Sequence, residues 1–163
     1  MRFLYLGLRQ DVSIASAAGH LSRTFSVGTV LTLTTDRLMV DISTFRSFMG
    51  FMTGNTNLYT NQFPRAMAEC KPWIAKQFPQ LMKGDVNMDR LLERFDDQAN
   101  KSFKSQLPDI LAGFLSDVCI HFKLPTELPV YAMDPHRHLR IDPAEEYEAQ
   151  TGRTSIVSIS LQN

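Results

Sequence analysis

The chain has 163 residues, of which 44% are apolar and 21% are charged, and this composition excludes a disordered chain and a fibre. Seventeen basic and seventeen acidic residues give a formal net charge of zero, which argues against a general polyanion binder. A membrane-spanning helix needs about 18 consecutive apolar residues, and no stretch of the sequence approaches this length, so we expect no membrane association.

The N-terminal region differs in character from the rest. Residues 3–8 are mostly apolar, but charged and polar residues follow at once, and the run is too short for the core of a secretory signal. We therefore predict a short strand here. Residues 11–25 are small and polar, and both a loose helix and a mobile arm fit them. The expected organisation is an N-terminal extension or edge strand over 1–25, followed by a single domain over 26–163.

Two consecutive segments then alternate between apolar and polar or β-branched residues. The first covers residues 27–35 and the second covers residues 38–42, and Asp36 with Arg37 between them favours a turn. This pattern predicts a β-hairpin. The residues expected to face the core are Val27, Leu31, Leu33, Leu38, Val40 and Ile42.

Helical spacing of apolar residues begins after the predicted hairpin. Ser43 has the chemistry of a helix N-cap, and Gly54 is placed to end that helix in a left-handed conformation. A second helix is predicted to begin near residues 62–64. It is expected to kink or restart at Pro72 and to stop at Pro79, because proline lacks the amide N–H that a helix interior needs.

Two further helices have the clearest apolar stripes. The third is predicted to be capped by Asp85 or Asn87, and its stripe extends as far as Phe103. The fourth is predicted to start at Pro108, because proline is favoured in the first turn of a helix.

The C-terminal part begins with an irregular stretch over residues 125–133. Asp142 and Pro143 then start a short acidic helix that ends at Gly152, and residues 154–161 alternate apolar residues with serine as a final strand. The order of elements predicts an α+β fold. Its small, mainly antiparallel sheet, built from the N-terminal hairpin and the C-terminal strand, would pack with about four helices.

Few residues offer obvious chemistry. His136 and His138 would lie on one side of an extended segment, but a zinc site needs three or four ligands, so an exposed polar loop over 134–141 is the simpler interpretation. Cys70 and Cys119 both fall in apolar helical patterns, which indicates buried thiols and a reducing compartment. We therefore expect no cofactor and assign no catalytic residue.

The segment over residues 51–65 has little amphipathic pattern and is rich in Asn and Thr. Its polar side chains either form a network that fixes the loop or form a recognition loop on a rigid scaffold. In the second case the contacts would come from the loop over residues 55–65 and from 134–141, because Arg and Tyr often carry binding energy. The candidate partner-binding residues are Asn57, Tyr59, Gln62, Arg65, Arg137 and Arg140.

Several runs resemble a family of small bacteriophage and prophage proteins that has been treated as a domain of unknown function. These runs are residues 26–35, 51–54, 62–65 and 69–73. The end also looks similar, with Asp142 and Pro143 before a short acidic helix and Gly152 before a terminal strand, so the resemblance covers about residues 26–160. It implies a phage accessory protein that acts in the host bacterial cytoplasm. It supplies no catalytic residues.

The missing catalytic constellation, the neutral charge and this resemblance predict an accessory protein that binds and modulates a host protein. An inhibitor of a bacterial defence system, similar in role to an anti-CRISPR protein, is the expected example, although fold-level analogy cannot fix function. One alternative is a nucleic-acid-binding accessory protein, based on the basic residues and aromatics near the second predicted helix. The other is a small metal-assisted enzyme that uses His136 and His138.

Overall fold

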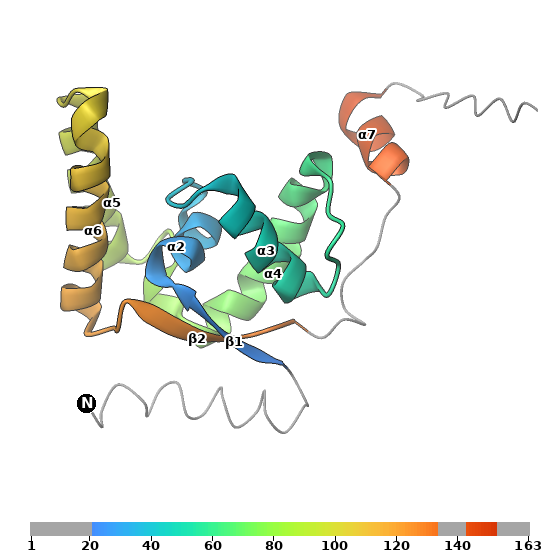
Figure 1. Cartoon of the computed structure of the whole chain (residues 1–163), viewed down its shortest axis with the longest axis horizontal. Coiled ribbons are helices and arrows are strands. Elements are labelled where there is room, and N and C mark those ends of the chain that lie inside the picture. Colours follow the sequence, from blue (N-terminus) through green and yellow to red (C-terminus); the bar gives the residue numbers. More distant parts are fainter. Residues whose placement is uncertain (1–20, 134–142, 153–163) are drawn as a thin grey trace, which may run out of the picture.

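The computed structural model describes residues 21–133 and 143–152, and this part of the chain holds six α-helices and two β-strands (Figure 1). In chain order the elements are β1 (Ser22–Ser26), α2 (Val27–Thr35), α3 (Ile42–Thr53), α4 (Phe63–Gln77), α5 (Val86–Asn100), α6 (Leu107–Phe122), β2 (Glu127–Tyr131) and α7 (Pro143–Thr151). Three single-turn 3-10 helices join them: η1 (Thr60–Gln62), η2 (Pro79–Leu81) and η3 (Lys104–Gln106).

The sheet consists of β1 and β2 alone among the described residues. The two strands are antiparallel, with Ser22 opposite Tyr131 and Ser26 opposite Glu127. The protein is therefore mostly helical with a small antiparallel sheet, which agrees with an α+β fold, although the helices outnumber the expected four. β1 crosses the expected boundary between residues 25 and 26, and the division itself stays a prediction.

The predicted hairpin strand over residues 27–35 is wrong, because these residues form α2. Every residue of α2 is buried, so the helix has no polar face that would reveal its period. The threonines of α2 alternate with apolar residues in the sequence, as in a half-buried strand. Their hydroxyls form hydrogen bonds within the helix instead: Thr32 Oγ1 donates to Gly28 O at 2.8 Å, and Thr35 Oγ1 donates to Leu31 O at 2.6 Å. Tertiary packing therefore overrides the β-propensity of these residues.

The predicted second strand over residues 38–42 is also wrong. Leu38 is 60% exposed and Ile42 is 50% exposed, so two of the three residues expected to face the core face solvent. Ile42 begins α3, and its N-cap is Asp41 rather than Ser43. The Asp41 carboxylate accepts a hydrogen bond from Thr44 N at 2.9 Å and also bonds the Ser43 hydroxyl. The hydroxyls of Ser43 and Thr44 lower the pKa of Asp41 below its usual range.

The remaining described helices follow the predicted pattern closely. Gly54 ends α3 with a φ of 69°, and Asp85 caps α5 by accepting hydrogen bonds from two backbone amides. α4 continues through Pro72, so the predicted restart there does not occur. Phe103 does not extend the α5 stripe, because α5 ends at Asn100 and the Phe103 side chain is 79% exposed.

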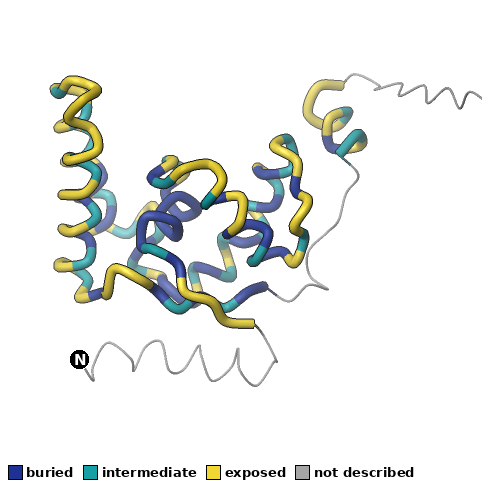
Figure 2. The backbone as a smooth tube through the Cα atoms, in the orientation of Figure 1, coloured by how far each residue is buried: buried dark blue, intermediate teal, exposed yellow. Residues whose placement is uncertain are grey.

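The core surrounds α2, which lies among α3, α4 and the sheet (Figures 1 and 2). The stretch predicted as irregular contains β2, whose edge is held by α4. Gln77 Oε1 accepts from Tyr131 N at 2.8 Å, Gln77 Nε2 donates to Tyr131 O at 3.0 Å, and Trp73 Nε1 donates to the same oxygen at 2.8 Å. The strands predicted over 3–8 and 154–161 lie outside the described residues.

Candidate partner-binding surfaces

The loop between α3 and α4 is predicted to bind a partner. Some of its side chains are exposed to solvent, and others form hydrogen bonds within the loop or to α3. Asn57 is exposed, and Tyr59 is 61% exposed. Gln62 instead closes the η1 turn, because its Oε1 accepts a hydrogen bond from Tyr59 N at 2.9 Å. Leu58 is buried, and its carbonyl accepts from Arg46 Nη1 at 2.8 Å. The loop is therefore a fixed platform that presents Asn57 and Tyr59.

Arg65 joins this loop to α7. Its guanidinium lies 3.5 Å from the carboxylate of Glu146 on α7 and 3.5 Å from that of Glu69, one turn along α4. Asn61 Nδ2 adds a hydrogen bond to Pro143 O at 2.8 Å. These contacts are the polar network that the loop composition suggested as one alternative. A role for Gln62 and Arg65 in partner contact stays a prediction.

The second predicted contact loop, residues 134–141, lies outside the described residues. Arg137, Arg140, His136 and His138 all belong to it. In the part of the chain that the structure describes, no group of three or more His, Cys, Asp or Glu side chains is placed to hold a metal ion.

The two cysteines are free thiols. Cys70 is buried in α4, as expected, and Cys119 is half-buried in α6. Burial, with a smaller contribution from the Glu69 carboxylate, raises the pKa of Cys70 to about 12, and burial also raises the pKa of Cys119. Because the thiolate is the nucleophilic form, neither thiol has the environment of a catalytic cysteine.

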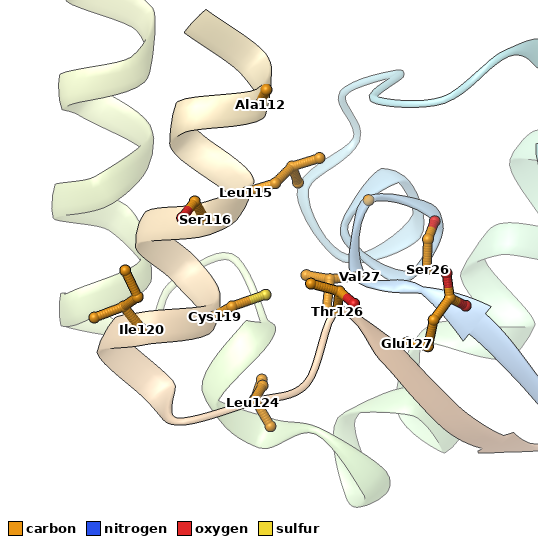
Figure 3. Close-up of a pocket in the computed structure, with 11 residues that line it drawn as sticks. Ser26, Val27, Ala112, Leu115, Ser116, Cys119, Ile120, Leu124, Thr126 and Glu127 are labelled. Carbon is orange, nitrogen blue, oxygen red and sulfur yellow. The ribbon is translucent and has the colours of Figure 1, made fainter. Parts of the chain in front are cut away.

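An open groove of about 520 Å³ lies between α6 and the junction where β1 passes into α2 (Figure 3). Leu115 and Cys119 point from α6 toward the α2 side. A Cβ at Gly28 would meet Leu115 Cδ1 at 3.3 Å, so this glycine permits the close approach of α2 and α6. The lining residues are Ser26, Val27, Gly28, Ala112, Leu115, Ser116, Cys119, Ile120, Leu124, Thr126 and Glu127.

The chemistry of this groove is apolar with one charged group. Apolar atoms make up most of its exposed lining, and Glu127 is the only carboxylate among the described residues that line it. Within residues 21–133 and 143–152, no Lys or Arg lines the groove and no cation forms an ion pair with Glu127. The groove therefore presents an apolar surface with an uncompensated negative charge at its edge.

The helix that forms one wall is only partly covered. Of the residues of α6, only Phe114 and Val118 are buried, and Ile120 at the groove is 73% exposed. Figure 1 shows α5 and α6 standing as a hairpin beside the rest of the molecule, and Figure 2 shows the exposed face that results. Ile120 therefore extends the apolar lining of the groove onto this exposed face.

Sequence reasoning missed this groove. One signal was present: Ile120 is a large apolar residue that lies off the inward stripe of the predicted fourth helix. The opposite wall could not be found, because Ser26 and Glu127 are brought together by strand pairing across about a hundred residues of sequence.

Within the described residues, no helix has both the length and the apolar character needed to cross a membrane. Residues 25–84 match the family model of a domain of unknown function, DUF7736. This match runs from the end of β1 through α2, α3 and α4 to the turn before α5, which is less than half of the chain, and α6 lies beyond it. No curated protein and no solved structure shows significant similarity to the chain. The family model that matches α2, α3 and α4 therefore gives no functional assignment.

Proposed function

We propose that this protein binds a host protein and that the groove between α6 and the β1–α2 junction is its main contact surface. The observation that carries this proposal is an apolar groove of about 520 Å³ with the 73% exposed Ile120 at its wall. A small-molecule site encloses most of its ligand's surface, whereas this groove is open to solvent. Its open, apolar lining is better suited to protein side chains.

The chemistry of the groove defines the segment that it would accept. An apolar segment would cover Leu115, Cys119 and Ile120, and a helix with anchors three and four residues apart is the common solution for such grooves. The Glu127 carboxylate, which pairs with no cation among the described residues, favours a Lys or Arg near one end of that segment. The proposed occupant is therefore an apolar helix of the host protein that carries a basic residue.

The cellular setting is also part of the proposal. The resemblance of the runs over residues 26–35, 51–54, 62–65 and 69–73 to small phage proteins supports a phage-encoded accessory protein that acts in the host bacterial cytoplasm. The host protein would then be one whose modulation benefits the phage, such as a defence effector. Asn57 and Tyr59, which the α3–α4 loop presents to solvent, would supply separate contacts away from the groove.

A photo-cross-linking experiment tests this proposal. A benzophenone amino acid replaces Ser116, an exposed residue at the groove, and the full chain is irradiated in a nuclease-treated lysate of the bacterial host. We expect mass spectrometry to find one dominant cross-linked peptide that is apolar and contains a basic residue. Adding Ile120→Asp should reduce the yield about tenfold or more, because the variant places a charge where an apolar contact forms.

Phe103→Asp is the matched control, since it makes the same kind of change at a 79% exposed position near the other end of α6. It should leave the cross-linking yield unchanged. Equal loss in both variants, or cross-links distributed over many unrelated peptides, would refute the groove as the docking site. Recovery of nucleic acid alone, when nuclease is omitted, would instead favour the nucleic-acid-binding alternative.

A further inference from the structure

A second hollow, of about 330 Å³, lies between β1, α3 and the loop that follows α3. We call it the arginine pocket. Its described lining combines two guanidinium groups, hydroxyls and one aromatic ring, and contains no carboxylate. The lining residues are Arg23, Arg46, Ser47, Gly50, Phe51 and Thr56.

Both guanidinium groups are held in place by aromatic rings. The Arg23 guanidinium carbon lies 5.2 Å from the centre of the Phe25 ring, and that of Arg46 lies 5.3 Å from the centre of the Phe63 ring. These distances are typical of cation–π contacts. Arg46 Nη1 also donates to Leu58 O at 2.8 Å. The two cations are therefore partly ordered before any ligand arrives, which reduces the entropy lost on binding.

The charge of these two side chains is not compensated within the described residues. Arg37 pairs with Asp96, and Arg65 pairs with two carboxylates. Arg23 and Arg46, in contrast, form no ion pair with a described Asp or Glu. The pocket thus concentrates positive charge on a chain whose formal net charge is zero.

We propose that the arginine pocket binds carboxylates of an acidic peptide segment, with Arg23 and Arg46 as its two cationic contacts. The planar guanidinium fork matches the two oxygens of a carboxylate, and Arg46 keeps donors free after bonding Leu58 O. The hydroxyls of Ser47 and Thr56 can donate to the same oxygens. The site is separate from the α6 groove, and none of its lining residues is shared with it.

A peptide fits these features better than a nucleic acid. Nucleic-acid binding draws on many phosphate contacts and on a basic surface, whereas this chain has zero formal net charge and the pocket offers two cations. The loop that supplies Thr56 also presents the exposed Asn57 and Tyr59, which provide polar and aromatic contacts for a peptide backbone and side chains.

Fluorescence anisotropy with labelled hexaglutamate, at low ionic strength and with the full chain, tests the proposal. We expect saturable binding that weakens about tenfold in Arg23→Ala/Arg46→Ala, because two exposed ion pairs are lost. Arg90→Ala/Arg94→Ala removes the same charge from exposed positions on α5 and should retain binding. The affinity of Arg23→Lys/Arg46→Lys should lie between those of the wild type and the double alanine variant, since lysine keeps the charge but lacks the planar guanidinium fork.

Thermal unfolding of each variant shows whether the fold is kept. Arg46→Ala could disturb the loop by removing the hydrogen bond to Leu58 O. In that case Arg23→Ala alone tests the proposal, because Arg23 lies at an exposed position of β1 and its loss should still weaken hexaglutamate binding. Absence of saturable binding to the wild type, or equal loss in the α5 control, would overturn the proposal. A labelled hexathymidine that binds more tightly than hexaglutamate, with the same arginine dependence, would also overturn it. Ile120→Asp should leave hexaglutamate binding unchanged, so this test is independent of the proposed groove.

Discussion

The bond between Gln77 and β2 gives the sharpest test of how the fold is held together. Gln77 is only 7% exposed, and its amide bonds both backbone groups of Tyr131. Gln77→Met keeps the approximate volume but leaves Tyr131 N without an acceptor. Tyr131 O remains bonded by Trp73 Nε1 at 2.8 Å. Only the part-buried Tyr131 N–H therefore loses its partner, and leaving a buried donor unpaired costs about 1–3 kcal/mol.

A loss of about 2 kcal/mol should lower the Tm by about 4–8 °C in a chain of this length. Circular dichroism melts of the wild type and of Gln77→Met measure this difference. Gln98→Met is the control, because Gln98 is exposed on α5, and its Tm should stay close to that of the wild type. Equal melting temperatures for the two variants would refute the assignment of the amide pair as a structural bond.

Three further outcomes are expected from the described contacts. Thr32→Val should lower the free energy of unfolding by about 1–3 kcal/mol in urea titrations, because the buried Thr32 hydroxyl accepts from Met39 N at 3.0 Å. Asp85→Ala should cost about 0.5–2 kcal/mol by the same measurement, because it removes the α5 N-cap. In thiol titration with an aromatic disulfide, Cys119 should react before Cys70, whose pKa of about 12 and full burial suppress the thiolate until the chain unfolds.

Each of these outcomes has its own control. Thr34→Val should cost less than Thr32→Val, because the Thr34 hydroxyl makes one long bond of 3.5 Å to Leu31 O. Asp97→Ala changes an exposed residue near the other end of α5 and should be nearly neutral. Equal reaction rates for both thiols in the folded protein would contradict the burial of Cys70.

Local patterns in the sequence determined the amphipathic helices. The stripe of α3 is read from Phe45, Phe48 and Met52, which are all buried, and α5 shows both its stripe and its Asp85 cap. These signals are local because each such helix has one buried and one solvent-facing side, so burial repeats with the helical period. The α+β class followed from the same reasoning, although both strands of the predicted hairpin were wrong and the strands predicted over 3–8 and 154–161 stay predictions.

Only the tertiary structure decided the fate of residues 27–35. A helix that is buried on every side shows no period, and its threonines satisfy their hydroxyls inside the helix, so nothing in the local sequence separates it from a strand. The pairing of β1 with β2 depends on contacts across about a hundred residues. The α6 groove and the arginine pocket each form between elements that are distant in the sequence. The sequence alone therefore could not show which residues would lie together in them.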